Sequence, residues 1–358
     1  MTAAFGVYIH VPFCSRRCDY CAFATWTDRH HLQGVYLDAV RTEIERAVAD
    51  GMPAATSVFV GGGTPSLVDA QALGAVLDAV PVAPGAEVTV ECNPENVDER
   101  LLGIYGDHGV DRVSFGVQSM VPSVLAALGR VHDPAAVERA VRAARTAGLR
   151  TFNLDLIYGG AGERLEDWRC TLERALALDP PHVSAYALTI EAGTPLAADP
   201  ARHPDDDDLA DKYELADELL GGAGLDSYEI SNWARSGHEC RHNLLYWRQG
   251  DYRGFGCAAH SHRSGRRWWN VRTPDRYVEL VAAGEPTEAA GEDLDGAVRR
   301  REGLELALRT RDGVPADAFD AALLESGDLD GLVDVVAGRV RLTRHGRLLA
   351  NEVALRLR

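Results

Sequence analysis

The first half of the chain alternates between short apolar runs and longer segments in which apolar residues recur with the period of a helix. The short runs are rich in β-branched residues and have the length of buried strands. The predicted strands are 6–10, 57–60, 87–91, 112–115, 151–156 and 182–187, and the predicted helices are 32–49, 70–80, 99–105, 135–147 and 165–178. Strands that alternate with helices indicate βαβ units and a parallel sheet.

Six such repeats predict an α/β fold, either a partial (β/α)6 barrel or a wound sheet. In these folds, ligand sites lie on the loops at the carboxyl ends of the strands. The unusual residues of this chain fall at those ends. Three cysteines follow the first strand and a glycine run, 61–63, follows the second, while Glu91, Gln118 and Asp155 lie at the ends of the third, fourth and fifth.

The repeat pattern stops near residue 195, and we expect three segments. Residues 1–200 form the β/α barrel, and residues 201–285 form an extension that contains a helix over 209–220 and dense polar and aromatic clusters. Residues 286–358 are mainly helical, with one strand-like run over 338–342 before a last helix. Helices with a short strand at the end of a chain predict a small winged-helix-like domain.

Charge restricts the partners that the protein can have. The 358 residues include 54 Asp and Glu against 37 Lys and Arg, for a formal net charge of −17. Such a surface repels phosphate backbones, so nucleic acid is not expected as a partner. Lys212 is the only lysine. It lies in an acidic segment of helical pattern, 205–220, where a solvent-exposed face is expected rather than Schiff-base chemistry.

Cysteine usage and the lack of long apolar runs indicate the compartment. Seven cysteines, three of them within the first 21 residues, do not resemble a secreted disulfide framework. Residues 1–5 have no basic flank or apolar run of a secretory signal, and no stretch is long enough for a transmembrane segment. We expect a cytoplasmic protein, for which peripheral membrane contact stays open.

Cys14, Cys18 and Cys21 form a C-x3-C-x2-C arrangement in one loop. Three thiolates so close in sequence can hold one soft metal site, and around a four-iron cluster they leave one iron open to a small molecule. Two other interpretations compete: unliganded surface thiols, and a structural zinc site with His10 as the fourth ligand. Structural zinc usually joins two separated ligand pairs in a small domain, so the cluster is favoured.

The cysteine loop resembles that of the radical S-adenosylmethionine superfamily, C-x3-C-x-aromatic-C, with Tyr20 as the aromatic residue. The glycine run resembles the Gly-Gly-Thr-Pro element of that family. The resemblance implies a [4Fe-4S] cluster on Cys14, Cys18 and Cys21, with S-adenosylmethionine bound at the open iron. The residues that it implies for cofactor binding are Tyr8, Tyr20, Gly62, Gly63, Thr64, Glu91, Gln118, Arg130 and Asp155.

One subgroup, the oxygen-independent coproporphyrinogen III oxidases and their relatives, is similar over essentially the whole chain. The similar stretches are 8–13, 91–94, 116–119, 128–130 and 155–159. The oxidases carry a further cysteine where this chain has Phe23, and an arm ahead of the barrel, whereas only seven residues precede Tyr8. These departures argue against oxidase activity.

The segment 242–247, H-N-x-x-Y-W, resembles the haem chaperones of the same subgroup, in which this histidine is implicated in holding haem. Imidazole is a common axial ligand of haem iron. The resemblance implies a chaperone that binds haem at His242 and passes it to an unidentified acceptor protein, the alternative being a coproporphyrinogen III oxidase. Without the resemblance, the favoured interpretation is that His242 caps a helix and that Tyr246 and Trp247 pack in a core.

Overall fold

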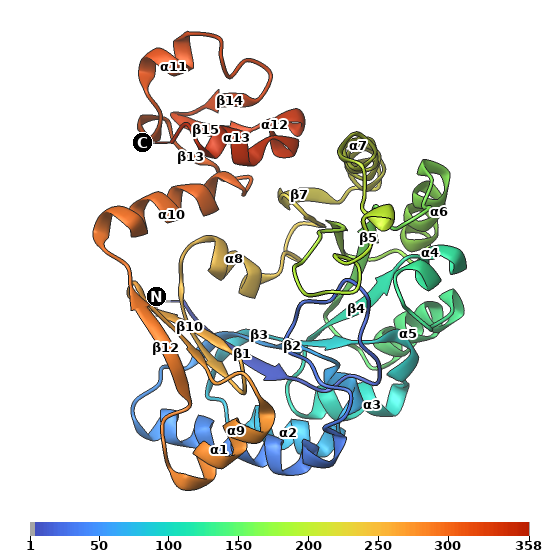
Figure 1. Cartoon of the computed structure of the whole chain (residues 1–358), viewed down its shortest axis with the longest axis vertical. Coiled ribbons are helices and arrows are strands. Elements are labelled where there is room, and N and C mark those ends of the chain that lie inside the picture. The colour runs from blue at the N-terminus through green and yellow to red at the C-terminus, as the bar shows by residue number, and fades with distance from the viewer. Residues whose placement is uncertain (1–3, 358) are drawn as a thin grey trace.

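The computed structural model describes residues 4–357, so residues 1–3 and 358 of the first and third predicted segments lie outside the described residues. Six parallel strands follow one another as neighbours in one twelve-stranded sheet (Figure 1). They are β1 (Phe5–Val11), β2 (Ala55–Gly62), β3 (Val82–Cys92), β4 (Arg112–Gln118), β5 (Thr151–Tyr158) and β6 (His182–Ala187). The predicted partial (β/α)6 barrel is confirmed, with its sheet open rather than closed.

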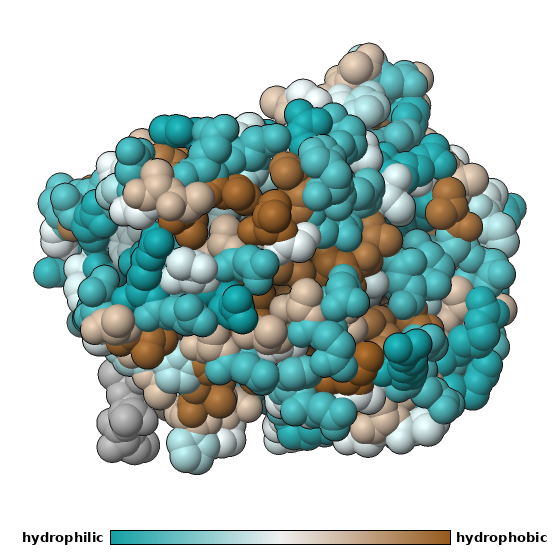
Figure 2. Space-filling model, turned by 90° about the horizontal axis from the view of Figure 1, so that it is seen from below, coloured by the Kyte–Doolittle hydropathy of each residue, from teal (hydrophilic) through white to brown (hydrophobic). Residues whose placement is uncertain are grey.

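Helices cover the outer face of this curved sheet. They are α1 (Gln33–Ala49), α2 (Ala70–Asp78), α3 (Glu99–Asp107), α4 (Pro122–Ala127), α5 (Pro134–Thr146) and α6 (Leu165–Leu176). Short 3-10 helices cover His30–Leu32, Pro65–Leu67, Pro94–Asn96, Pro200–Arg202 and Ala316–Ala318. Seen from the helix-covered side below (Figure 2), apolar side chains gather toward the centre of the face, among hydrophilic ones.

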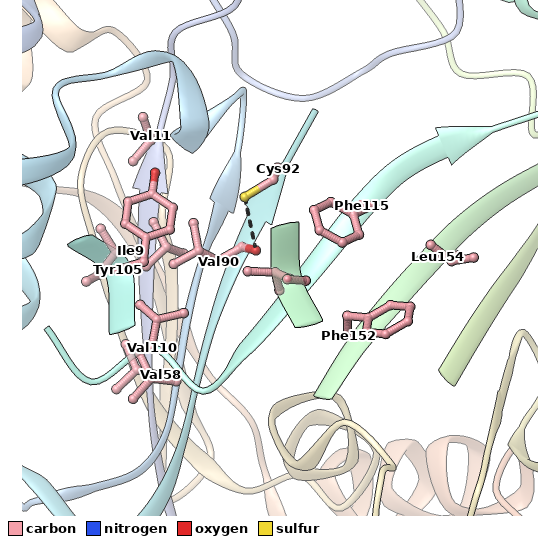
Figure 3. Close-up of a cluster of buried hydrophobic side chains, with 14 of the residues drawn as sticks. Ile9, Val11, Val58, Val90, Cys92, Tyr105, Val110, Phe115, Phe152 and Leu154 are labelled. Atoms are coloured by element: carbon pink, nitrogen blue, oxygen red, sulfur yellow. Dashed lines mark hydrogen bonds between the residues drawn. The ribbon is translucent and has the colours of Figure 1, made fainter. Parts of the chain in front are cut away.

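Side chains alternate along each strand between the hydrophobic core and the interior of the barrel. On β1, Val7, Ile9 and Val11 are fully buried against the helices, and Figure 3 shows how residues such as Val90 and Phe115 of the next strands continue this layer. Each fully buried side chain of this kind contributes about 1.5–3 kcal/mol. The side chains at the other, alternating positions of the strands point into the barrel and are largely polar. The functional side chains therefore share its interior.

Residues beyond 200 extend the sheet at both edges. Helix α7 (Asp206–Gly222) is followed by β7 (Asp226–Glu229) and β8 (Asn232–Ala234), and β8 pairs antiparallel with β6. At the other edge β9 (Asp251–Phe255) runs parallel to β1. The remaining elements are α8 (Arg241–Trp247), β10 (His260–Arg263), β11 (Arg266–Asn270), α9 (Pro274–Ala283) and β12 (Glu288–Asp293).

A small C-terminal domain has its own core around Leu308, Phe319, Val340 and Val353. Its helices surround a three-stranded antiparallel sheet, in keeping with the winged-helix-like prediction, although the sequence indicated only one of the strands. Its elements are α10 (Gly296–Leu308), β13 (Val314–Pro315), α11 (Ala321–Glu325), β14 (Val333–Val336), β15 (Arg339–Leu342), α12 (Arg344–Leu348) and α13 (Ala350–Ala354). Strand β12 pairs with β11, so the main sheet extends to Asp293.

Lys212 on α7 does not lie on a solvent-exposed face, and that expectation was wrong. Its side chain is fully buried. The ammonium donates to the Glu163 carbonyl at 2.8 Å and pairs with the carboxylates of Asp208 at 2.5 Å and Glu163 at 3.4 Å. These contacts tie α7 to the loop after β5, because a buried ammonium needs nearby negative charge.

No helix within residues 4–357 is long and apolar enough to cross a membrane.

Candidate cluster and cofactor site

The three cysteines lie on the loop that leaves β1 at the carboxyl end of the barrel strands. Hydrogen bonds fold this loop back on itself: the Cys14 amide donates to the Trp26 carbonyl at 3.1 Å, and the Trp26 amide to the Pro12 carbonyl at 2.8 Å. Each of the three thiols is partly exposed. Burial raises the pKa of Cys14, which the nearby Thr64 hydroxyl partly offsets, and burial also raises the pKa of Cys21. Binding to iron supplies the positive charge that favours the thiolates.

The glycine run after β2 lies directly against the cysteine loop. The Gly63 amide donates to the Val11 carbonyl at 2.8 Å, and the Thr64 hydroxyl lies 3.6 Å from the Cys14 sulfur. A Cβ atom on Gly63 would come within 2.7 Å of the Val11 carbonyl oxygen, and Gly62 has a φ of 106°. Glycine is therefore required here, because no other residue allows the two loops to approach so closely.

Arg130 reaches the cysteine loop from the segment after α4. One terminal nitrogen donates to the Asn93 side chain and to the Gly116 carbonyl, both at 2.9 Å. The other lies 3.8 Å from the Cys18 sulfur. The guanidinium is thus fixed beside the cluster loop, where it can meet an anionic group.

Two carboxylates face the interior below the loops. Glu91 accepts a hydrogen bond from the Gly62 amide at 3.1 Å, and burial, reinforced by the charge of Asp155, raises the pKa of Glu91 to about 7. Asp155 accepts from the Ser114 hydroxyl and the Asn153 amide, both at 2.7 Å. Burial likewise raises the pKa of Asp155. A carboxylate enclosed in this way is stabilised by a cationic or hydroxyl-bearing ligand.

These groups line one cavity of about 550 Å³. The structure brings together nearly all the predicted site residues in its wall, and only Tyr8 and His242 are not among them. The predicted residues in the wall are Cys14, Cys18, Tyr20, Cys21, Gly62, Gly63, Thr64, Glu91, Gln118, Arg130 and Asp155. Ser114, Tyr186 and Leu188 also line the cavity and were not predicted. The first two could have been found, because they lie at positions of β4 and β6 whose side chains point into the barrel.

Tyr8 lies deeper in the barrel, where its hydroxyl is 3.0 Å from His10 Nδ1. The other ring nitrogen of His10 is 2.9 Å from the Ala24 carbonyl oxygen, and burial lowers the pKa of His10 to about 4. Both nitrogens are therefore engaged, which leaves none for zinc. Among residues 4–357, no three His, Cys, Asp or Glu side chains come close enough to hold a single ion. Three partly exposed thiols around a glycine-lined cavity instead fit a cluster, whose irons each take one thiolate.

His242 lies at the opposite end of the barrel, on α8. It is fully buried, and its ring stacks on Phe59 at 5.5 Å between centroids. Nδ1 lies 2.9 Å from the Ser57 hydroxyl and Nε2 lies 2.8 Å from the Tyr246 hydroxyl. Burial lowers the pKa of His242 to about 3. Both ring nitrogens are therefore engaged, and iron ligation here requires α8 to leave its place.

Helix α8 closes the amino end of the barrel. Glu87 of β3 accepts hydrogen bonds from the backbone amides of Arg241 at 2.9 Å and His242 at 3.3 Å. A Cβ atom on Gly6 of β1 would lie only 2.5 Å from Leu245, so α8 sits tightly against the strand starts. The segment for which the sequence predicted haem binding thus closes the amino end of the barrel.

Other possible iron ligands in the extension do not converge. Cys240 is buried beside Glu87, and Cys257 is buried 3.6 Å from the Tyr36 hydroxyl. His260 is exposed and stacks on Trp269, whereas His262 is bonded to the Gly250 carbonyl.

An open β/α barrel with a C-x3-C-x2-C loop beside a glycine-lined cavity is the architecture of the radical SAM class. The family model described as the Radical SAM superfamily matches residues 8–175. A solved structure, the coproporphyrinogen III oxidase of Escherichia coli, superposes with a TM-score of 0.84 over 99% of this chain and 89% of that one. Its identity is 24%, so this likeness concerns the fold.

Curated relatives narrow the class further. The protein called heme chaperone HemW in Mycobacterium tuberculosis strain H37Rv is 44% identical over 98% of this chain and 93% of its own length. The protein of that name in Escherichia coli K12 is 37% identical, over 97% and 96%. The chain therefore belongs to the radical SAM superfamily and, within it, to the family of the heme chaperone HemW proteins. Membership implies the use of an iron–sulfur cluster and S-adenosylmethionine.

Proposed function

We propose that this protein is a haem chaperone of the cytoplasm, which binds haem and passes it to an acceptor protein while carrying a [4Fe-4S] cluster with S-adenosylmethionine. The observation that carries the proposal is the 44% identity to a protein called a heme chaperone, which extends over 98% of the chain. The formal charge of −17 supports a partner other than nucleic acid.

In this proposal, Cys14, Cys18 and Cys21 hold the cluster and leave one iron open for S-adenosylmethionine. When bound there and reduced, the cluster would supply the electron for cleavage of the sulfonium. Thr64 and Arg130 then position the ligand at the mouth of the cavity, since both lie against cluster cysteines.

The buried carboxylates act on the remainder of the ligand. Glu91 binds the amino group or ribose hydroxyls, because it is enclosed and has no ion-pair partner among the described residues. Asp155 is oriented for the same ligand by Ser114 and Asn153. Tyr20 and Gln118 complete the wall, and Tyr8 supports the cavity from below through His10.

Anaerobic reconstitution followed by haem titration tests the proposal. We expect stoichiometric cluster assembly, saturable haem binding, and transfer of bound haem to an apo-haemoprotein. The alternative, a coproporphyrinogen III oxidase, predicts steady protoporphyrinogen formation with reductant and S-adenosylmethionine. That result, or the failure of the reconstituted protein to bind haem, would overturn the proposal. Phe23 at the position of the oxidases' additional cysteine supports the expected outcome.

A further inference from the structure

Helix α8 carries the histidine for which the sequence predicted haem binding, and it is closed over the amino end of the barrel. The side chain of His242 is fully buried, and both of its ring nitrogens are hydrogen-bonded. Leu245 packs against Gly6 on the inner side of the helix, and α10 lies on its outer side (Figure 1). A haem iron can reach His242 only after α8 has moved, so the contacts that hold α8 control access to this histidine.

The first turn of α8 is held from the barrel side by the carboxylate of Glu87 on β3. Its Oε1 atom accepts hydrogen bonds from the backbone amides of Arg241 at 2.9 Å and His242 at 3.3 Å. The capping position of α8 is occupied by Cys240, whose thiol is only a weak hydrogen-bond acceptor. Glu87 therefore satisfies amides for which α8 itself supplies a poor acceptor.

Glu87 is fixed by the barrel, so α8 can leave without stranding a buried charge. The side chain of Glu87 is 1% exposed, and its Oε2 atom lies 3.5 Å from the guanidinium of Arg150. Arg150 is held in turn by Asp111, just before β4, at 2.6 Å. Because neither of these residues belongs to α8, the carboxylate keeps a cationic partner when the helix moves away. Its hydrogen bonds to the α8 amides can thus break and form again.

The segment that carries α8 can move as a unit. It is bounded by Gly237 and Gln249, which both have a left-handed backbone, with φ values of 85° and 49°. A helix of seven residues is too short to be stable alone and depends on contacts with the rest of the molecule. On the outer side, Arg248 and Asp312 form an exposed ion pair at 3.4 Å, which contributes little. Together with the packing of Leu245, the hydrogen bonds to Glu87 therefore hold α8 closed.

We propose that Glu87 is a positioning residue that keeps α8 closed, and that loss of its hydrogen bonds to the α8 amides releases His242 for haem. The release of His242 to haem rests on the proposed haem-chaperone function, whereas the movement of α8 can be measured without haem. A closed state competes with iron ligation and lowers the apparent affinity for haem. Removal of Glu87 should therefore strengthen haem binding, whereas loss of a merely structural contact would weaken it.

The thiol of Cys240 reports the opening of α8 in the absence of haem. It is fully buried at the capping position of the helix, so an alkylating reagent such as iodoacetamide reaches it when α8 leaves. Cys92 and Cys257 are buried in the barrel core and serve as internal standards, the first of them shown in Figure 3. Global unfolding exposes all three thiols, whereas opening of α8 exposes Cys240. Mass spectrometry of the labelled peptides gives the rate at each cysteine.

The variant is Glu87→Ala in the reconstituted full-length protein. We expect Cys240 to be labelled at least roughly tenfold faster, with Cys92 and Cys257 unchanged, because hydrogen bonds to a charged group are lost. Glu87→Gln keeps an acceptor for the amides and should lie closer to the wild type. The matched control is Glu43→Ala, which removes a buried carboxylate on α1 that is hydrogen-bonded to residues outside α8 and should leave Cys240 labelling unchanged.

Haem titration of the same proteins completes the test. We expect roughly tenfold tighter haem binding for Glu87→Ala than for the wild type, in proportion to the faster labelling. Unchanged labelling of Cys240, or equal acceleration at all three thiols, would overturn the inference, as would faster labelling with weaker haem binding. If the wild-type protein binds no haem, the proposed function is wrong. Faster labelling of Cys240 alone then still supports the role of Glu87 in holding α8, and unchanged labelling excludes it.

Discussion

Replacing Glu91 with glutamine tests the electrostatics of the cofactor cavity. Glu91→Gln keeps the shape and the acceptor for the Gly62 amide but removes the charge. A hydrogen bond to a charged group contributes about 1.5–3 kcal/mol, which corresponds to roughly ten- to hundredfold weaker binding of S-adenosylmethionine. This full effect is expected at about pH 8.5, where Glu91 is ionised, since burial raises the pKa of Glu91 to about 7.

The carboxyl group of Glu91 also predicts that the affinity for S-adenosylmethionine depends on pH. A cationic ligand favours the ionised carboxylate, so binding lowers the pKa of Glu91. Affinity is therefore fully present above pH 7 and is lost as the pH falls through 7, by up to about tenfold per unit. The glutamine variant should lack this dependence.

Anaerobic equilibrium dialysis of the cluster-loaded protein at about pH 6 and about pH 8.5 measures both effects. Glu45→Gln, an exposed carboxylate on α1, is the control. A variant that binds like the wild type at the higher pH, or that retains the same pH dependence, would refute the reasoning.

Three further changes have defined outcomes. Lys212→Met should destabilise the barrel by about 3–5 kcal/mol, because the Glu163 carboxylate is left buried without its cation, and Lys212→Met with Glu163→Gln should recover much of this in urea unfolding. Equal stability of the single variant and the wild type contradicts this. Gly63→Ala should reduce iron content on reconstitution, since its Cβ would press on the Val11 carbonyl; full iron content would show that the loops can separate. Cys18→Ser should fold, by circular dichroism, but fail to assemble the cluster, and normal cluster absorbance would exclude Cys18 as a ligand.

The sequence predicted the barrel well because each of its elements is long enough to show its own period. All six strands and the helices between them, apart from the short α4, were found, with ends that differ by a few residues. The cavity was also predictable, since the carboxyl ends of neighbouring parallel strands must meet. The motif residues at those ends therefore line one space.

The features that sequence missed depend on contacts between distant residues. Lys212 looked like part of an exposed acidic helix because its partner Glu163 lies 49 positions away. The contact of His242 with Ser57 could not be predicted either, because Ser57 lies 185 positions earlier. The two missed strands of the C-terminal sheet, β13 and β14, are two and four residues long, too short to show an alternating pattern.

The position of helix α8 at the amino end of the barrel has a consequence for the order in which ligands enter its interior. His242 and Leu245 pack against the strand starts, and the cavity at the other end of the barrel is lined by the cysteine loop. A molecule that enters between the loops at the carboxyl ends of the strands passes the cysteines before it reaches Asp155, so two ligands that share this cavity would bind in a defined order.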